Sequence, residues 1–252
     1  MRSKIFILLF LCLSILFCAS SPKKIERERE NSPEYQYNLG LFFLNEGNVD
    51  KAVFHLDRSD AIKPGNYLVH HALGLAYSMK GELEKSVKCF QKALQLNTKS
   101  TETRNVLGVI YQEMGFLDKA EQEFRNAISD TTYVSRELPY YNLARLHIIK
   151  EDYKTALDYV ERALEFDSRM VLSHNLKGVI LEKLDRWEEA IDSYELALKI
   201  APDDVNILFN LGVAHFNNND LEEAREIFEK IRSDVTDPEI KEKIETYLKS
   251  IR

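Results

Sequence analysis

The 252-residue sequence predicts an all-α protein, a solenoid of six helical hairpins closed at its C-terminal end by one capping helix. Three observations support this fold class. A pair of residues, most often Leu-Gly, recurs with a period close to 34 residues. Apolar residues between successive pairs follow helical spacing. The chain is 44% apolar with only nine Gly and six Pro, which is typical of packed helices and not of a disordered chain.

The clearest unit covers residues 171–204. Its second half places Ala190, Tyr194 and Ala197, four and three residues apart, on one face of a predicted helix that Pro202 ends. Its first half has an apolar stripe of its own and a small glycine. The unit is therefore a helical hairpin.

All six units share this pattern. The paired position occurs at steps of 34, 34, 36, 34 and 34 residues, as Leu39-Gly40, Leu73-Gly74, Leu107-Gly108, Leu143-Ala144, Lys177-Gly178 and Leu211-Gly212. Twelve positions later every unit has a small residue: Ala52, Ser86, Ala120, Ala156, Ala190 and Ala224. Four positions further on lies an apolar residue: Leu56, Phe90, Phe124, Val160, Tyr194 and Phe228. Small residues at two of these positions let the two helices of a hairpin cross closely.

The period and these residue types resemble the tetratricopeptide repeat. The resemblance implies a right-handed α-solenoid that binds protein partners. The predicted repeats cover residues 33–66, 67–100, 101–136, 137–170, 171–204 and 205–236. A capping helix is expected over 237–252, because the last repeat would otherwise expose its stacking face. It begins at Asp237-Pro238, and its apolar face consists of Ile240, Ile244, Tyr247, Leu248 and Ile251.

The turn inside each hairpin needs a residue in the left-handed backbone region. Glycine adopts that region at least cost. The first three repeats have Gly47, Gly81 and Gly115 there, and the later ones have Glu151, Asp185 and Asn219.

Residues 1–17 have the features of an export signal. Arg2 and Lys4 precede the thirteen-residue stretch Ile5–Phe17, which is apolar apart from one serine. A membrane-spanning helix needs about 20 apolar residues, so this stretch has the length of a signal core. Its last residues and the following Cys18 resemble a bacterial lipobox.

The lipobox resemblance implies that Cys18 is diacylated and becomes the new N-terminus. Two or three acyl chains hold a protein permanently on a bilayer. Ala19 after the cysteine implies the outer membrane, with the protein facing the periplasm. Residues 19–32 are polar and of mixed charge, so 18–32 is expected to be the lipidated cysteine and a flexible tether. Phe17 stands where the lipobox has Gly, Ala or Ser, and the alternatives are a secretory signal cleaved near Ser20 or an uncleaved anchor.

The step of 36 residues lies between the third and fourth repeats. Its two extra residues either extend a helix or form a loop within 130–139. Here the chain resembles the PilF/PilW/Tgl family of type IV pilus biogenesis lipoproteins. The resemblance rests on the domain layout and on Asp130, Tyr133, Asn142 and Leu143, and Val134 stands where the family usually has Pro.

The sequence contains no pattern that predicts catalysis. It has no HExxH, CxxC, GxSxG or phosphate-binding glycine loop, so we expect no enzyme activity, cofactor or metal. His70 and His174 occupy repeat positions that favour Trp, and His147 and His215 occupy positions that favour Tyr, so packed substitutes are expected. Cys89 is the one cysteine of the repeat region and is expected to be partly buried. A net charge of -7 without a basic stripe disfavours nucleic acid or bare anionic lipid as the main partner.

A groove for a protein partner is expected along the first helices of the hairpins. Apolar and aromatic side chains there suit a peptide or an amphipathic helix, and Asn side chains suit its backbone or ends. The alternative is that some of these residues pack between helices and that Asn142 and Asn210 only bond neighbouring backbone. The candidates are Tyr37, Leu41, His71, Leu75, Asn105, Val109, Tyr141, Asn142, Arg145, Asn175, Val179, Phe209, Asn210 and Val213.

These observations predict a non-catalytic, lipid-anchored scaffold that binds a protein through its groove. The family resemblance implies a role as a pilotin, with the outer-membrane secretin of a type IV pilus as the partner. The alternative is a general envelope adaptor, for example one that recruits cell-wall hydrolases or secretion factors.

Overall fold

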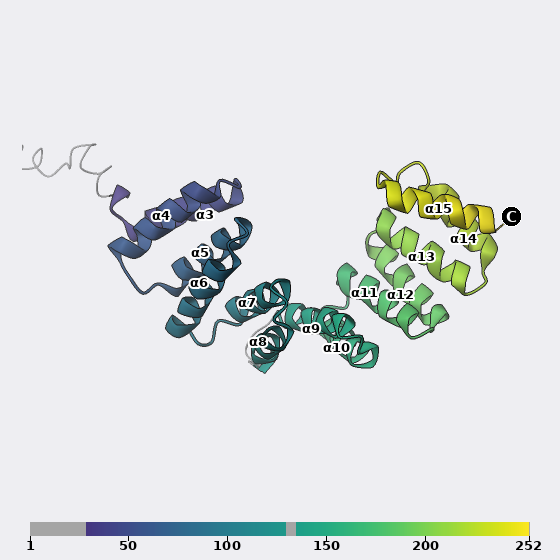
Figure 1. The fold of residues 1–252 in the computed structure, drawn as a ribbon, viewed down its shortest axis with the longest axis horizontal. Coiled ribbons are helices and arrows are strands. Elements are labelled where there is room, and N and C mark those ends of the chain that lie inside the picture. The colour runs from purple at the N-terminus through teal and green to yellow at the C-terminus, as the bar shows by residue number, and fades with distance from the viewer. Residues whose placement is uncertain (1–28, 130–134, 252) are drawn as a thin grey trace, which may run out of the picture. The chain divides into compact units, whose positions relative to one another are not determined.

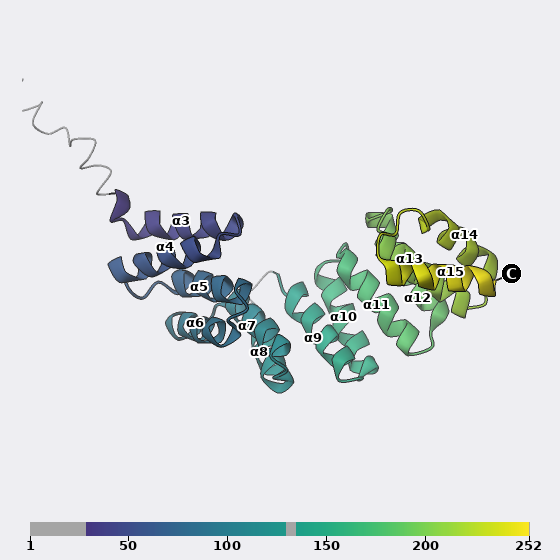
Figure 2. The ribbon, with the colours of Figure 1, turned by 45° about the horizontal axis from the view of Figure 1, so that its top comes forward.

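The computed structural model describes residues 29–129 and 135–251, and the described part of the chain is helical throughout (Figures 1 and 2). Consecutive helices pair into hairpins. The first five pairs are α3 (Pro33–Asn45) with α4 (Val49–Ile62), α5 (Tyr67–Met79) with α6 (Leu83–Leu96), α7 (Thr101–Glu113) with α8 (Leu117–Ser129), α9 (Glu137–Ile149) with α10 (Tyr153–Phe166), and α11 (Val171–Lys183) with α12 (Trp187–Ile200). The last pair is α13 (Val205–Asn217) with α14 (Leu221–Ile231), and α15 (Pro238–Ser250) follows it.

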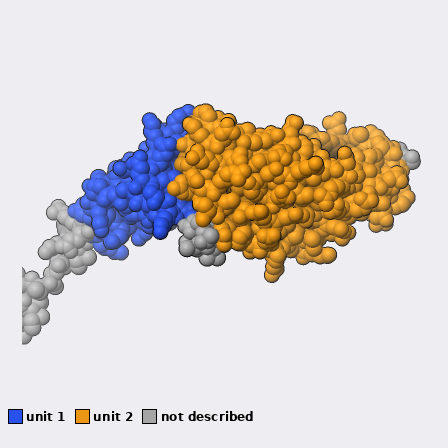
Figure 3. All heavy atoms as spheres, turned by 90° about the horizontal axis from the view of Figure 1, so that it is seen from below, with its two compact units in different colours: residues 1–103 blue, residues 104–252 orange. Residues whose placement is uncertain are grey.

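Each predicted repeat begins at the first residue of a helix. The helical hairpins and the all-α fold class are confirmed. The chain divides into two compact units, residues 1–103 and 104–252, which Figure 3 colours blue and orange. The groove candidates of α3 and α5 lie in the first unit, and the remaining ones lie in the second.

The two helices of a hairpin cross at the paired position. A Cβ atom built on Gly40, Gly74, Gly108, Gly178 or Gly212 would lie within 2.7 Å of the apolar side chain sixteen residues later. Real Cβ contacts are not that short, so only glycine permits the observed approach. The fourth repeat has Ala144 instead, and its partner position holds the smaller Val160, with both residues fully buried.

The turns follow the predicted backbone. Gly47, Gly81 and Gly115 have φ angles of 71°, 72° and 79°. Glu151, Asp185 and Asn219 occupy the same place with φ angles of 59°, 56° and 70°. The hairpin therefore requires a left-handed turn residue in every repeat. The three non-glycine residues adopt this conformation at a cost in backbone strain.

The capping helix closes the last repeat as expected. The Asp237 carboxylate accepts hydrogen bonds from the backbone N–H groups of Glu239 and Ile240 at 2.8 and 3.3 Å. Ile244 of α15 is fully buried in a cluster with Phe228 of α14. The other predicted members of the apolar face complete this cluster: Ile240, Tyr247, Leu248 and Ile251.

Helix α9 has 13 residues, like the other first helices, and α8 is described to Ser129, with 13 residues against the 14 of α4, α6, α10 and α12. Residues 130–134 lie outside the described residues, so the choice between a longer helix and a loop stays a prediction. The start of α9 is fixed by aromatic packing, because the Arg136 guanidinium lies 4.5 Å from the centre of the Phe166 ring, on which Tyr140 also stacks.

Several predicted features lie outside the described residues: the signal segment, Cys18, most of the tether, Asp130, Tyr133 and Val134. The last tether residues are described. Arg29 and Glu30 are helical, and the Glu30 carbonyl accepts a hydrogen bond of 2.6 Å from the Gln36 side chain. The end of the predicted tether therefore contacts the first hairpin. Within residues 29–129 and 135–251, no helix has the length and apolar character needed to cross a membrane.

The crossing contact predicts a specific pattern of mutational coupling. Gly108→Ala adds a methyl group about where the Phe124 ring lies, 2.5 Å from its Cε1 atom. We expect a loss of about 1–3 kcal/mol in unfolding free energy, measured by urea denaturation. Combined with Phe124→Val, which copies the Ala144 and Val160 pair, the loss should be smaller than the sum of the two single losses. Additive losses would contradict the contact.

The strained turns predict a stabilising substitution. Glu151→Gly should raise the unfolding free energy by about 0.5–1 kcal/mol, because glycine adopts the positive φ without a Cβ clash. Gly81→Ala is the matched reverse change and should lower stability by about 1 kcal/mol. If the urea midpoints of Glu151→Gly and Gly81→Ala shifted in the same direction, backbone strain at these turns would not be the cause.

Candidate protein-binding site

The groove candidates all lie on first helices of hairpins, as the repeat pattern predicts. In the first unit, Leu41 of α3 is 38% exposed, while Tyr37, His71 and Leu75 are half-buried. These four side chains are one exposed leucine, one half-buried leucine and two half-buried rings. That mixture suits a ligand with apolar side chains.

His71 is tied to its surroundings and is not a free base. Its Nδ1 lies 2.9 Å from the Thr103 hydroxyl, and its ring meets the Phe90 ring edge-on at 5.5 Å. Burial lowers the pKa of His71, although the Glu102 carboxylate at 3.9 Å acts in the opposite direction. The imidazole is therefore neutral at pH 7 and contributes shape and one hydrogen-bonding nitrogen.

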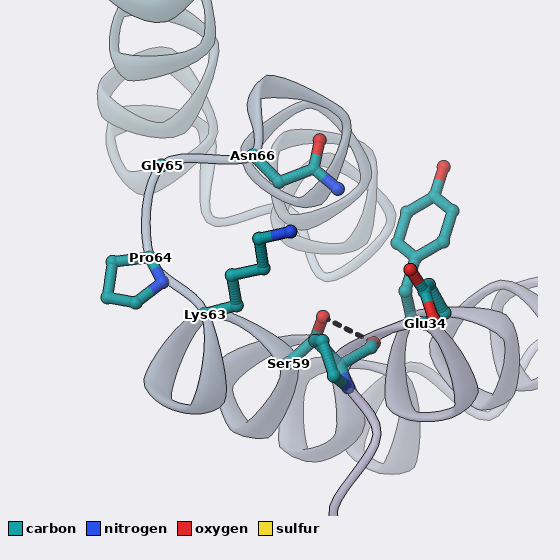
Figure 4. A pocket seen from close by; sticks show the side chains of 8 residues that line it. Glu34, Ser59, Lys63, Pro64, Gly65 and Asn66 are labelled. Carbon is teal, nitrogen blue, oxygen red and sulfur yellow. Dashed lines mark hydrogen bonds between the residues drawn. The ribbon is translucent and has the colours of Figure 1, made fainter.

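A small cavity adjoins Tyr37 at the first hairpin (Figure 4). Its volume is about 170 Å³, and it is lined by Pro33, Glu34, Tyr37, Ser59, Lys63, Pro64, Gly65 and Asn66. The Ser59 hydroxyl donates a hydrogen bond of 2.8 Å to the Pro33 carbonyl. Organic cofactors and drug-sized ligands fill about 300–1,000 Å³, so this cavity is suited to a single side chain of a partner.

Sequence analysis did not identify this cavity. Lys63 and Asn66 flank a Pro-Gly turn, which gave a turn signal but no indication of a binding site. Glu34, Lys63 and Asn66 come together because the end of α4 and the start of α5 both meet the first turn of α3. Only the packed structure shows that meeting.

In the second unit, the Asn candidates form pairs across repeats. The Asn142 amide donates to the Asn105 side-chain oxygen at 2.9 Å, and the Asn210 amide donates to that of Asn175 at 3.1 Å. The donors belong to α9 and α13, and the acceptors to α7 and α11. The expected alternative was that Asn142 and Asn210 bond neighbouring backbone. Each instead bonds the side chain of another asparagine. Asn142 is only 7% exposed, so it serves to orient Asn105, whereas the half-buried amides of Asn105, Asn175 and Asn210 keep donors or acceptors that can meet a peptide.

Arg145 is the exposed cation of this surface. Its guanidinium lies 5.9 Å from the centre of the half-buried Tyr141 ring, one turn earlier on α9. Half-buried apolar residues continue the surface on α7, α11 and α13: Val109, Val179, Phe209 and Val213. The second unit therefore offers amides, an aromatic ring, a cation and aliphatic side chains together.

The four signature histidines are largely covered, and the Nδ1 of His147 lies 3.3 Å from the Asp152 carboxylate. His147 is 7% and His174 is 9% exposed. The His174 ring contacts the Ser168 carbonyl at 2.9 Å, and His70 and His215 lie 3.4 and 3.3 Å from Asp60 and Asp220. They pack as predicted, and each also lies beside a polar group. Among the described residues, no three His, Cys, Asp or Glu side chains gather to hold a metal ion.

Four segments of the chain match the tetratricopeptide repeat family, at residues 67–100, 139–169, 178–219 and 207–235. The TPR repeat-containing protein MJ1428 of Methanocaldococcus jannaschii is 29% identical over 115 residues. That match covers 46% of this chain but only 18% of the relative. The likeness is therefore one of repeats and not of whole proteins.

Solved structures show the same fold over most of the chain. PilF of Pseudomonas aeruginosa aligns with a TM-score of 0.76 at 19% identity, covering 87% of this chain and 99% of PilF. PilW, a widely conserved type IV pilus biogenesis factor, aligns with a TM-score of 0.77 at 14% identity, covering 84% of this chain and 97% of PilW.

The chain is a tetratricopeptide-repeat protein, and this fold generally serves as a non-catalytic scaffold for binding proteins. Within that class its fold resembles those of PilF and PilW.

The environment of Cys89 predicts slow thiol chemistry. The side chain is half-buried, and burial, with the nearby Asp57 charge, raises the pKa of the thiol from 9.0 to about 11. A shift of that size lowers the thiolate fraction below pH 9 roughly 100-fold. In a chain whose other cysteines are replaced by Ala, alkylation by iodoacetamide at pH 8 should be slow and should accelerate strongly in urea. Equal rates in both states would show a reactive, exposed thiol.

Proposed function

We propose that the protein is a non-catalytic, lipid-anchored outer-membrane scaffold that faces the periplasm and binds the secretin of a type IV pilus machine. The observation that carries this proposal is the shared fold with PilF and PilW, which this chain matches over 99% and 97% of their lengths. The lipobox-like sequence at Cys18 and the polar tether support the anchor.

The mode of binding follows from the groove surface. Apolar side chains of a partner segment would lie against Val109, Val179 and Val213, where aliphatic groups are half-buried. The half-buried amides of Asn105, Asn175 and Asn210 would bond the segment's backbone, with Asn105 oriented by the buried Asn142. Because each of these amides is already hydrogen-bonded to another asparagine, little side-chain entropy is lost on binding.

The anchor is tested by removing the acyl acceptor. Cys18→Ala should move the protein from the membrane fraction to the soluble periplasmic fraction, or leave an uncleaved precursor of lower mobility on gels. Cys89→Ala is the matched control and should fractionate like the unaltered protein. A Cys18→Ala protein with unchanged membrane association and mobility would refute lipidation.

The groove is tested by charge reversal. Arg145 of α9 and Arg162 of α10 are both exposed and belong to the same hairpin, but only Arg145 lies on the candidate surface. Arg145→Glu should weaken secretin binding by about tenfold or more, as loss of a central contact does, and Arg162→Glu should leave it within about twofold. Pull-down from detergent-solubilised membranes measures both variants.

Secretin assembly gives the cellular readout. Deletion of the gene should leave secretin monomeric or mislocalised and the cells without pili, and Arg145→Glu should partly reproduce this loss. Normal secretin multimers in the deletion strain would rule out the pilus role. Capture of hydrolases or secretion factors in their place would support the general envelope adaptor.

A further inference from the structure

The first hairpin exposes a surface that its counterparts bury. Phe42 of α3 is 55% exposed, while the residues at the same position in the other five repeats are no more than 3% exposed: Ala76, Ile110, Leu146, Ile180 and Ala214. Tyr35 of α3 is 36% exposed, while its counterparts Val69, Thr103, Ser173 and Ile207 are also at most 3% exposed. These positions are buried in the later repeats, and among the described residues nothing covers them in the first hairpin.

Phe54 of α4 extends this surface to a second helix. It is 60% exposed. The equivalent residues of the other repeats are all exposed and polar: Lys88, Gln122, Asp158, Asp192 and Glu226. A neighbouring hairpin does not cover this position in any repeat. Stacking between repeats therefore does not account for the aromatic residue at position 54.

The rings form one continuous strip across the hairpin. Phe42 meets Phe43 at 5.3 Å, Phe43 stacks on His55 at 5.3 Å, and His55 meets Phe54 at 5.1 Å between ring centres. We call Tyr35, Phe42, Phe43 and Phe54 the aromatic face. The three Phe rings are contiguous through His55, unlike singly scattered surface residues, which need no explanation, and Tyr35 lies seven residues before Phe42 on α3.

Cations flank the aromatic face. The Lys51 ammonium lies 5.1 Å from the centre of the Phe43 ring, and the Arg29 guanidinium lies 5.7 Å from that of Tyr35. Burial first, and then the charges of Arg58 and Lys51, lower the pKa of His55, so both cations act electrostatically on this ring of the strip.

The acids of α4 point elsewhere. Asp50 pairs with Lys80 at 2.7 Å, and Asp60 lies 3.4 Å from His70, both partners belonging to the second repeat. Asp57 acts electrostatically on the same side, since Asp60 and His70 are its charged neighbours. Of the acids of α3 and its C-terminal cap, the exposed Glu34 precedes Tyr35 and the exposed Glu46 follows Phe42 by four residues. The charged groups that lie over the rings themselves are the cations Arg29 and Lys51, so the net charge of -7 for the whole chain does not describe the immediate surroundings of the rings.

We propose that the aromatic face of the first hairpin is a membrane-contact surface that rests on the anionic headgroups of a bilayer. Aromatic side chains with flanking Lys and Arg are the composition of protein segments that lie in the membrane interface. Anionic headgroups attract such cations within a Debye length of the surface.

Two other occupants fit the face less well. In a symmetric pair of copies, Lys51 and Arg58 of one chain would meet the same cations of the other, and like charges oppose docking. A helix stacked in the manner of a preceding repeat would leave Phe54 exposed, because that position stays exposed in every repeat that has a predecessor. A bilayer surface needs neither arrangement.

The position of the face in the chain supports the assignment, and this step rests on the proposed lipid anchor at Cys18. Fourteen residues, 19–32, separate Cys18 from α3. A chain extends by at most about 3.6 Å per residue, so the first hairpin stays within about 50 Å of the anchoring lipid. The anchor thus holds the face at high effective concentration beside the bilayer, and weak contacts suffice to orient the repeats.

The test supplies the anchor chemically, so that it does not depend on lipidation in cells. The chain without residues 1–17, with Cys89→Ala and Trp187→Phe, is coupled through Cys18 to a maleimide lipid in vesicles. Phe54→Trp reports on the aromatic face, and Leu172→Trp, at a residue 57% exposed on α11, is the matched control. Circular dichroism verifies that each variant is folded.

On vesicles containing phosphatidylglycerol, brominated lipid should quench the tryptophan fluorescence of the Phe54→Trp variant, and its emission maximum should shift to shorter wavelength. The fluorescence of the Leu172→Trp variant should be unaffected. Lys51→Glu with Arg58→Glu, or vesicles of phosphatidylcholine alone, should reduce the quenching at least severalfold, as should high salt. Equal quenching at positions 54 and 172, or full access of aqueous iodide to position 54, overturns the proposal and leaves the face to a protein helix. Failure of Cys18→Ala to change fractionation would instead refute only the anchor.

Discussion

The contact between a glycine of the first helix and a large apolar side chain of the second is the constraint on which each hairpin depends. At Gly74, Gly108, Gly178 and Gly212 an aromatic ring occupies the space that a Cβ atom would need. This contact fixes the distance and the register at which the helices cross, so every hairpin presents the same residues to its neighbours. Repetition of one local contact then builds the array, because each module meets only the adjacent ones.

The sequence predicts the fold well because the signals are local. Helix starts, left-handed turns and the crossing pair all lie within one repeat, and the sixfold recurrence separates them from chance. The fourth repeat has Ala144 in place of glycine, and the sequence also shows the compensating change, since its partner position has the smaller Val160. The 36-residue step is ambiguous in the sequence, because a longer helix and a loop contain the same residues, and residues 130–134 lie outside the described part of the chain.

The candidate surface was predictable only in part. Helical spacing places its residues on first helices, but the Asn142 to Asn105 bond joins residues 37 apart and depends on how two hairpins pack. The cavity at Lys63 likewise arises where three helix ends meet. An alignment of the repeats shows the aromatic residue at position 54, but the signature positions do not include it, so the repeat pattern alone gives no reason to expect a surface there.

The first hairpin combines two surfaces that do not compete for the same side chains. Tyr37 and Leu41 of α3 are candidates for the partner groove, whereas Tyr35 and Phe42 belong to the aromatic face, which no described hairpin covers. Residues 41 and 42 are neighbours in sequence, but successive helical residues point about 100° apart, so they serve different surfaces. On α4 the charges divide in the same way, with acids held by Lys80 and His70 of the second repeat and with Lys51 beside the rings. A terminal repeat can therefore keep the stacking chemistry of the array on one side while its free side acquires a different use.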